Sequence, residues 1–195
     1  FNQKISFLTK KKEALQTFKK GLMQKIFSQE LRFKREDGTD YPEWEKAFFF
    51  EVFNRVKKKN SEGLTNALTI SAKQGLIDPL EYFNKDVSSS DKSNYSVILK
   101  DEFAYNKSYS KGYPLGAIKR NTRYDSGLVS PLYICFSSLE KRYISFYEHY
   151  FESGMFNRQI SRIAQEGARN HGLLNVSVVE FFNDTYVLKP SVDEA

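Results

Sequence analysis

The first part of the chain has the pattern of one long helix that cannot bury its own apolar face. In residues 5 to 27 leucines recur every seven positions, other apolar residues complete a narrow stripe, and lysines cover much of the remaining surface. We expect six stripe residues to pack against another surface: Ile5, Leu8, Leu15, Phe18, Leu22 and Ile26. A single helix leaves such a seam in water, so the stripe needs a partner helix or the domain that follows it. A basic amphipathic helix is also compatible with a membrane surface or a groove, but the narrow seven-residue seam favours helix pairing.

The helical pattern stops in a turn-rich acidic segment, residues 36 to 45. We therefore predict a helical region at residues 1–35, a linker at 36–46 and a globular domain at 47–190. Trp44, the only tryptophan, is expected to anchor the linker to the core. The chain starts at Phe1 and opens directly in the helical pattern, so we expect a fragment of a longer protein.

The domain itself alternates short strand patterns with short helix patterns. Strands are predicted at residues 67–71, 95–99, 127–136 and 186–188, with Pro131 moving the first half of the third one to a sheet edge or a bend. A short helix is predicted at 78–86, two helices or one kinked helix at 144–163, and a strand or helix at 176–182. These elements predict an α+β fold, with a small mixed or antiparallel sheet and flanking helices behind the long coiled-coil-type helix.

Composition limits the class of protein and its location. Aromatic residues make up 15% of the chain, with 17 Phe and 12 Tyr, which is ample for a core. The single cysteine, Cys135, allows no internal disulfide and fits a reducing compartment, and no apolar run is long enough to cross a bilayer. We therefore expect a cytoplasmic protein without a membrane partner.

The inventory of catalytic residues is poor. The chain has only two histidines, and it lacks the CxxC, HExxH, phosphate-loop and nucleophile-elbow patterns. Cys135 lies in an apolar strand pattern and is predicted to be a core residue. A carboxylate nuclease site stays open because acids are numerous, although they form no tight cluster. We predict a protein that is not an enzyme, with no metal and no cofactor of its own.

The charge is distributed unevenly along the chain. The net charge is +6, yet residues 1–35 hold ten of the 30 Lys and Arg residues and two of the 24 acids, a local +8 that leaves −2 for the rest. Any affinity for nucleic acid must therefore come from clustered patches and from the N-terminal arm rather than from bulk charge.

One such patch is residues 105–123, which contain five cations, no acid and a tyrosine every fourth position from Tyr105 to Tyr113. Gly112, Pro114 and Gly116 argue against a regular helix. Cations, amides and hydroxyls in a loop suit contact with phosphates and base edges. The alternative is a solvated basic loop over a sheet.

Several stretches together resemble type I restriction-modification specificity subunits. The helix end and linker carry part of the likeness, in residues 19–27 (KKGLMQKIF), 30–33 (ELRF) and 40–45 (DYPEWE). Within the domain the likeness lies in residues 105–114 (YNKSYSKGYP), 127–133 (GLVSPLY) and 164–174 (AQEGARNHGLL). Near the end of the chain, residues 189–194 (KPSVDE) are similar to the entry to the next conserved helix of the family. Residues 191–195 would begin that conserved region.

The resemblance implies a non-catalytic DNA target recognition domain attached to the end of a conserved spacer helix. Such a subunit reads one half of a bipartite double-stranded DNA target with each recognition domain. Its paired helices set the spacing and dock methyltransferase and restriction subunits, and S-adenosylmethionine is expected on the methyltransferase partner. The partner of the α-helical stripe would then be a second recognition half or partner helix.

We expect three groups of DNA-binding residues. Base-edge contacts are predicted for Asn106, Ser108, Tyr109, Ser110 and Tyr113. Phosphate contacts are predicted for Lys107, Lys111, Lys119, Arg120 and Arg123, one of which could read guanine. A second tier is Lys73, Gln74, Arg162, Arg169, Asn170 and His171, where His171 fits a turn histidine bonded to local backbone equally well.

Two other functions remain open. The chain could be the recognition end of a self-contained restriction-modification enzyme, or a protein-interaction module whose basic helix binds an acidic partner.

Overall fold

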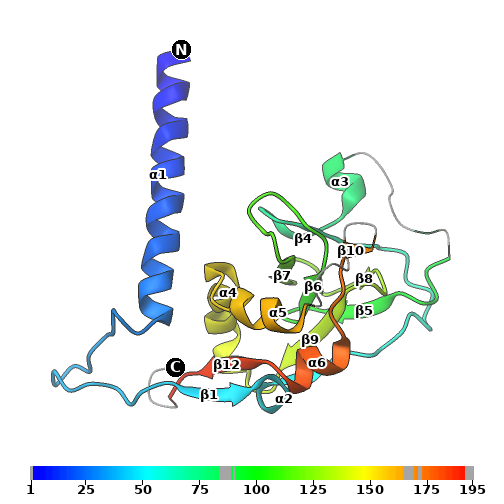
Figure 1. Ribbon diagram of the computed structural model, residues 1–195. Helices are drawn as coiled ribbons and strands as arrows, with labels where there is room; N and C mark the ends of the chain where they lie inside the picture. Colours follow the sequence, from blue (N-terminus) through cyan, green and yellow to red (C-terminus); the bar gives the residue numbers. More distant parts are fainter. Residues whose placement is uncertain (1, 84–88, 90, 165–168, 171–172, 192–195) are drawn as a thin grey trace.

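The computed structural model describes residues 2–83, 89, 91–164, 169–170 and 173–191, and it places one long helix beside a globular α+β domain (Figure 1). Helix α1, Asn2–Phe27, projects away from the domain, and its last turns contact helix α4, Ile144–Ser153. The remaining helices are short: α2 Phe49–Val52, α3 Pro79–Phe83, η1 Lys141–Tyr143, α5 Asn157–Ile163 and α6 Val178–Asn183. The fold class predicted from the sequence is confirmed.

An aromatic cluster fixes the base of α1 to the domain. Phe27 is buried, and its ring lies 6.0 Å from that of Trp44 and 5.3 Å from that of Phe146. The Tyr150 ring lies 5.4 Å from Phe27, and Trp44 meets Phe146 edge-on at 5.0 Å. Edge-to-face pairs at these spacings are favourable beyond the area that they bury. The predicted anchoring role of Trp44 is confirmed, and we call these four residues the base cluster.

Most of the apolar stripe of α1 is exposed. The side chains of Ile5, Leu8, Leu15, Phe18 and Leu22 are exposed, and Ile26 is half-buried. The sequence allowed two partners for this stripe, a second helix or the domain that follows. In the described structure the domain covers only the final turn of the helix. Just beyond it, Gln29 adopts the left-handed conformation (φ 62°) and ends the helix.

The central sheet has four strands in the order β2-β9-β6-β7, and each neighbouring pair is antiparallel. Their bounds are β2 Phe53–Arg55, β6 Phe103–Asn106, β7 Ala117–Arg120 and β9 Ile134–Ser138. Four antiparallel two-stranded ribbons complete the described strands: β1 Glu45–Phe48 with β12 Tyr186–Lys189, β3 Thr69–Ser71 with β4 Gly75–Ile77, β5 Ser96–Leu99 with β8 Ser126–Val129, and β10 Arg169–Asn170 with β11 Leu173–Leu174.

Each face of the central sheet has its own apolar cluster. On β6, Phe103 and Tyr105 belong to the larger cluster, whereas Ala104 between them belongs to the smaller one. On β9, Phe136 and Cys135 divide in the same way, as the two-residue period of a strand requires. Burial raises the pKa of the Cys135 thiol to about 12, and its predicted place in the core is confirmed.

Two predicted elements differ from the structure. The strand predicted at residues 127–136 is two strands in two sheets, because Pro131 supplies no N–H and the chain turns there, with the Tyr133 N–H donating to the Ser130 carbonyl. The stretch 105–123 is a hairpin rather than one long loop: β6 and β7 form its ends, and only residues 107–116 connect them. His171 and residues 192–195 of the predicted final region lie outside the described residues.

Candidate nucleic-acid interface

A groove with a cavity volume of about 410 Å³ separates the second half of α1 from the domain. Across from α1 lie the β3–β4 turn and the 107–116 loop, while Phe151 and Ile160 add apolar lining. An adjoining hollow of about 230 Å³ shares Lys19, Lys73 and Glu152 with it, and we call the two together the α1 groove. Its polar and charged lining residues are Gln16, Lys19, Lys20, Lys73, Gln74, Lys111, Tyr113, Lys119, Arg120, Thr122, Glu148, His149, Glu152 and Asn157.

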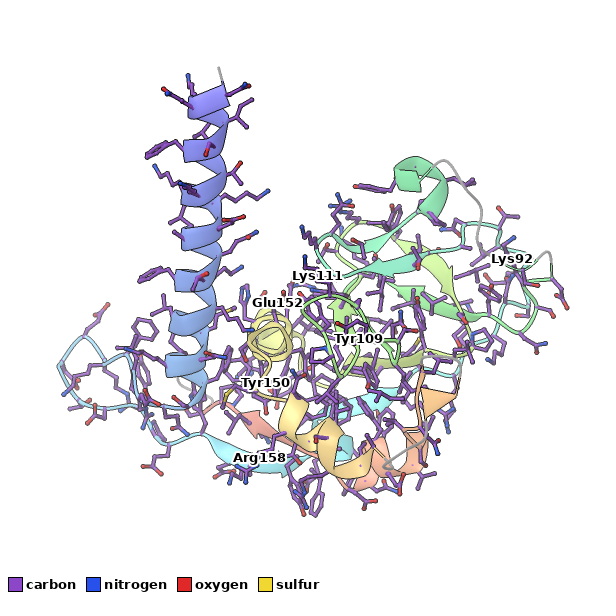
Figure 2. All side chains as sticks on the ribbon, turned by 45° about the horizontal axis from the view of Figure 1, so that its top comes forward. Lys92, Tyr109, Lys111, Tyr150, Glu152 and Arg158 are labelled. Atoms are coloured by element: carbon purple, nitrogen blue, oxygen red, sulfur yellow. The ribbon has the colours of Figure 1, made fainter. Side chains whose placement is uncertain are left out.

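The α1 groove is positively charged, since six of these residues are Lys or Arg and two are Glu. Four of the lysines are exposed, and among the described residues none of the four forms an ion pair: Lys19, Lys20, Lys73 and Lys111. They come from three segments that are distant in sequence. Figure 2 shows Lys111 and Glu152 on the side of the domain that faces α1. A concave surface lined by one sign of charge concentrates the field and attracts a polyanion.

The 107–116 loop is held in one shape by its own backbone. Ser110 and Tyr113 exchange two backbone hydrogen bonds, at 2.8 and 3.3 Å, across a turn in which Gly112 has φ 88°. At the end of the loop Gly116 has φ 81°, and a Cβ there would collide with the Asn106 carbonyl. The Tyr105 hydroxyl, inside the core, donates to the Leu115 carbonyl at 2.8 Å. The loop therefore presents its side chains from a fixed frame.

Glu152 of α4 connects this loop to the helix layer. One carboxylate oxygen accepts a hydrogen bond from the Tyr113 hydroxyl, and the other pairs with the Lys119 ammonium of β7. Lys119 also contacts Tyr113, both through its hydroxyl at 3.0 Å and over its ring at 4.6 Å. Burial first, then the hydrogen bond to Glu152 and its charge, raise the pKa of Tyr113, so this hydroxyl stays protonated and donates.

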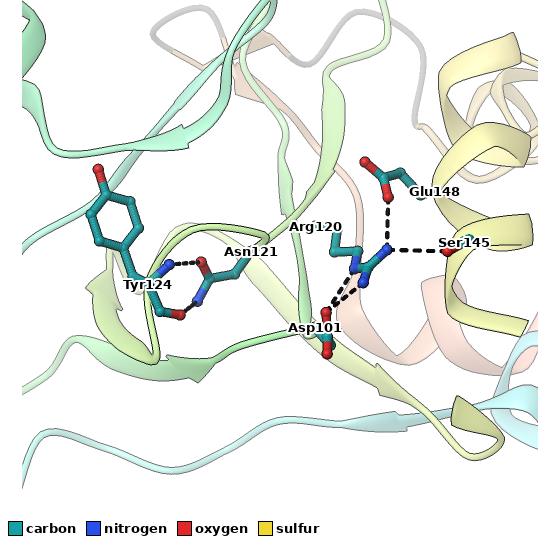
Figure 3. Close-up of polar contacts among 6 residues, drawn as sticks. All are labelled: Asp101, Arg120, Asn121, Tyr124, Ser145 and Glu148. Atoms are coloured by element: carbon teal, nitrogen blue, oxygen red, sulfur yellow. Dashed lines mark hydrogen bonds and ion pairs between the residues drawn. The ribbon is translucent and has the colours of Figure 1, made fainter. Parts of the chain in front are cut away.

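Arg120 forms a second link between β7 and α4 (Figure 3). Its guanidinium donates to Asp101 at 2.6 and 2.9 Å and to Glu148 at 2.9 Å, with a longer contact to Ser145 at 3.4 Å. Burial alone would lower the pKa of Arg120, but the hydrogen bonds and charges of the two carboxylates raise it. Asp101 reaches this position from a left-handed backbone conformation (φ 70°).

The turn after β7 is fixed by a buried asparagine. Asn121 donates from its side-chain amide to the Tyr124 carbonyl at 2.8 Å and accepts from the Tyr124 N–H at 3.1 Å (Figure 3). Beside it, Arg123 donates to the Tyr82 hydroxyl and stacks on that ring with 5.6 Å to the centroid. Arg123 thus packs on α3 and does not line the α1 groove.

The chain was compared with known families, curated proteins and solved structures, and the similarity found lies among the solved structures. No family model and no curated protein matches the sequence. Among solved structures, the chain is similar to the HsdS subunit from Thermoanaerobacter tengcongensis, with 14% identity and a TM-score of 0.48. The match covers 98% of this chain and 44% of that subunit, so the chain spans less than half of its length.

The structure brings together six of the predicted DNA-binding residues in the α1 groove, from both the first and the second tier. They are Lys73, Gln74, Lys111, Tyr113, Lys119 and Arg120. In two of them, Lys119 and Arg120, the charge is paired with carboxylates of the same chain. Lys107 is half-buried, its ammonium lies 3.5 Å from the Val176 carbonyl, and burial lowers its pKa.

The other predicted residues are spread over neighbouring surfaces. Asn106 and Ser108 line a separate pocket of about 230 Å³ with Ser130 and Tyr133. Tyr109 is exposed at the loop tip, and Ser110 is half-buried beside it. Arg162 is exposed on α5, and Arg169 and Asn170 form β10.

The local charge of residues 1–35 predicted that the N-terminal arm contributes to nucleic-acid affinity, but it did not indicate which of its residues line the groove. Lys19 and Lys20 were not singled out from the other lysines of the helix. Gln16 and His149 carried no signal in the sequence, because their place depends on the angle at which α1 meets α4.

The described residues also bear on metal binding and on membrane insertion. In the described part of the chain, no group of three or more His, Cys, Asp or Glu residues is placed to hold a metal ion. None of the described helices is both long and apolar enough to span a membrane.

Proposed function

We propose that this chain recognises double-stranded DNA in a sequence-specific manner, as a non-catalytic part of a type I restriction-modification specificity subunit. The observation that carries the proposal is the convergence on one groove of lysines from α1, the β3–β4 turn and the 107–116 loop that form no ion pair with any described residue. Such clustering matters because the rest of the chain beyond residue 35 is slightly acidic, so bulk charge would not bind DNA.

The residues divide into two roles. Lys19, Lys20, Lys73 and Lys111 contact phosphates, since their ammonium groups are exposed and unpaired in the described structure. Gln74 and the loop residues Ser108, Tyr109 and Ser110 would read base edges, directly or through water. Lys119 and Arg120 do not contact phosphates in this proposal, because their positive charges are neutralised by carboxylates of the same domain.

The remainder of the proposal follows from the resemblance in sequence. The chain would read one half of a bipartite target, and its α1 stripe would pair with a helix of a second recognition half. Methyltransferase and restriction subunits would dock on that assembly, and S-adenosylmethionine would bind to the methyltransferase. A protein-interaction module is the second candidate, favoured by the exposed apolar residues of α1.

Selection from randomised duplex DNA, with the chain and its methyltransferase partner, tests the proposal. We expect an enriched half-site motif. The absence of any motif would favour the interaction module, and methyl transfer or cleavage by the complete gene product alone would favour a self-contained enzyme.

Charge removal in the groove tests the site. Lys73→Ala with Lys111→Ala should weaken binding, and the slope of log K against log salt should fall by roughly 0.9 for each lysine that contacts a phosphate. Each single variant, Lys73→Ala or Lys111→Ala, is compared with Lys92→Ala, which also removes one positive charge, because Figure 2 shows Lys92 on the far side of the domain from α1. Equal effects of the groove and control variants would contradict the assignment.

A further inference from the structure

Glu152 is out of place in a groove for a polyanion. It lines both parts of the α1 groove, 33% of its side chain is exposed, and its negative charge would repel phosphates. Both of its oxygens are nevertheless occupied, one by the Tyr113 hydroxyl and one by Lys119. Lys119 is only 11% exposed, so the ion pair is largely withdrawn from water.

The two partners of Glu152 stand at functionally different places. Tyr113 closes the turn of the 107–116 loop, where its backbone carbonyl and N–H bond to Ser110. Lys119 belongs to β7, which is paired to β6 and so to the central sheet. Glu152 therefore ties the tip of the loop to the rigid sheet and to α4 at one point.

Helix α4 extends this connection to the other wall of the groove. Phe146 and Tyr150 of α4 contact Phe27 at the base of α1, while Glu152 and Glu148 face β7. The same helix thus sets the position of α1 and of the loop. An acid here costs some attraction for phosphate but fixes the geometry of the residues that meet the DNA.

We propose that Glu152 is a specificity-determining positioning residue, which holds the 107–116 loop in its DNA-reading shape through Tyr113 and Lys119. This inference rests on the proposed function. It assigns to Glu152 no contact with DNA, and it predicts opposite effects on target and non-target binding. If Glu152 acted only through its negative charge, its removal would raise the affinity for target and for non-target DNA alike.

Glu152→Gln in the full chain is the decisive variant, because the amide keeps the size of the side chain but turns one acceptor oxygen into a donor. With the amide nitrogen toward Tyr113, the hydroxyl can no longer donate to this side chain and would have to accept instead, and in either orientation Lys119 loses its charged partner. We expect non-target affinity to rise about twofold, as one negative charge leaves the groove. Target affinity should fall about tenfold, the order of one charge-assisted hydrogen bond.

Two comparison variants separate charge from positioning. Glu148→Gln also removes one acid from the groove, one helical turn away, but Glu148 pairs with Arg120 and not with the loop. It should raise non-target affinity without faster hydrogen exchange at the Ser110 and Tyr113 amides. Tyr113→Phe should lower the ratio of target to non-target affinity without any change in charge, and its effect should not add to that of Glu152→Gln.

The outcomes distinguish this inference from the proposed function. If the wild-type chain enriches no sequence, the proposed function fails, while the exchange rates of the loop amides still report whether Glu152 holds the loop. If the wild-type chain is selective and Glu152→Gln keeps the same affinity ratio, the inference is overturned. A lower melting temperature with an unchanged ratio would also overturn it, because Glu152 would then serve stability alone.

Discussion

Gly112 lies within the turn of the 107–116 loop and Gly116 lies at its end; both have a left-handed backbone, yet their surroundings differ. A Cβ at Gly116 would meet the Asn106 carbonyl and the Tyr105 ring, whereas Gly112 has open space. Gly112→Ala should cost about 1–2 kcal/mol of unfolding free energy from backbone strain alone. Gly116→Ala should cost about 2–4 kcal/mol, since a collision with backbone adds to that strain.

Denaturant unfolding of the two variants measures the difference, with Gly112→Ala as the control for backbone strain. Equal losses in the two variants would contradict the close packing of β6 against the end of the loop.

At the scale of single residues, the sequence indicated which side chains could meet DNA but not which were already engaged. Lys111 and Lys73 were predicted from local composition and do line the groove. Lys119 and Arg120 had the same local signal, but the carboxylates that pair with them lie on α4 and in the turn before β6, up to 33 residues away. Such pairings depend on the packing of α4 on the sheet, which no local pattern encodes.

At the scale of elements, the spacing of apolar residues predicted the helices and strands whose pattern is long or regular. The helix at the start of the chain, the break near Gly154 and the final strand were all predicted, and the left-handed Gly154 (φ 82°) ends α4 there. The run at 127–136 is two strands rather than one, with the bend that Pro131 predicted between them, because apolar composition continues through a turn. The partners of β9 could not be predicted, since the central order β2-β9-β6-β7 places it between two strands that are far from it in sequence.

The base cluster leads to a prediction about the placement of α1. Trp44→Ala should reduce the unfolding free energy by about 2–4 kcal/mol, because a large half-buried ring between Phe27 and Phe146 is lost. It should also broaden the distribution of distances between one spin label on α1 and another on the domain. Trp44→Phe, which keeps an aromatic ring in place, should retain most of both properties. Narrow distances in the alanine variant would show that α1 is held by other contacts.

At the scale of the whole molecule, salt should affect the two proposed interactions of α1, helix pairing and DNA binding, in opposite directions. Its 26 residues span about 39 Å of helix, and most of the apolar stripe lies in water. The same helix carries seven lysines and one glutamate, so two copies repel each other while DNA attracts them. Screening of exposed charges should therefore strengthen helix pairing and weaken DNA binding.

We predict that the isolated chain self-associates through this stripe, and more strongly as salt rises. Leu8→Lys with Leu15→Lys should abolish the association and change the unfolding free energy of the domain by less than about 0.5 kcal/mol, because both side chains are already exposed. Sedimentation at low and high salt measures the first effect, and denaturant unfolding the second. A chain that stays monomeric at high concentration and high salt would rule out pairing with a second copy, and the stripe would then require a helix of different sequence. A salt response in the opposite direction would place the lysines, rather than the leucines, at the contact.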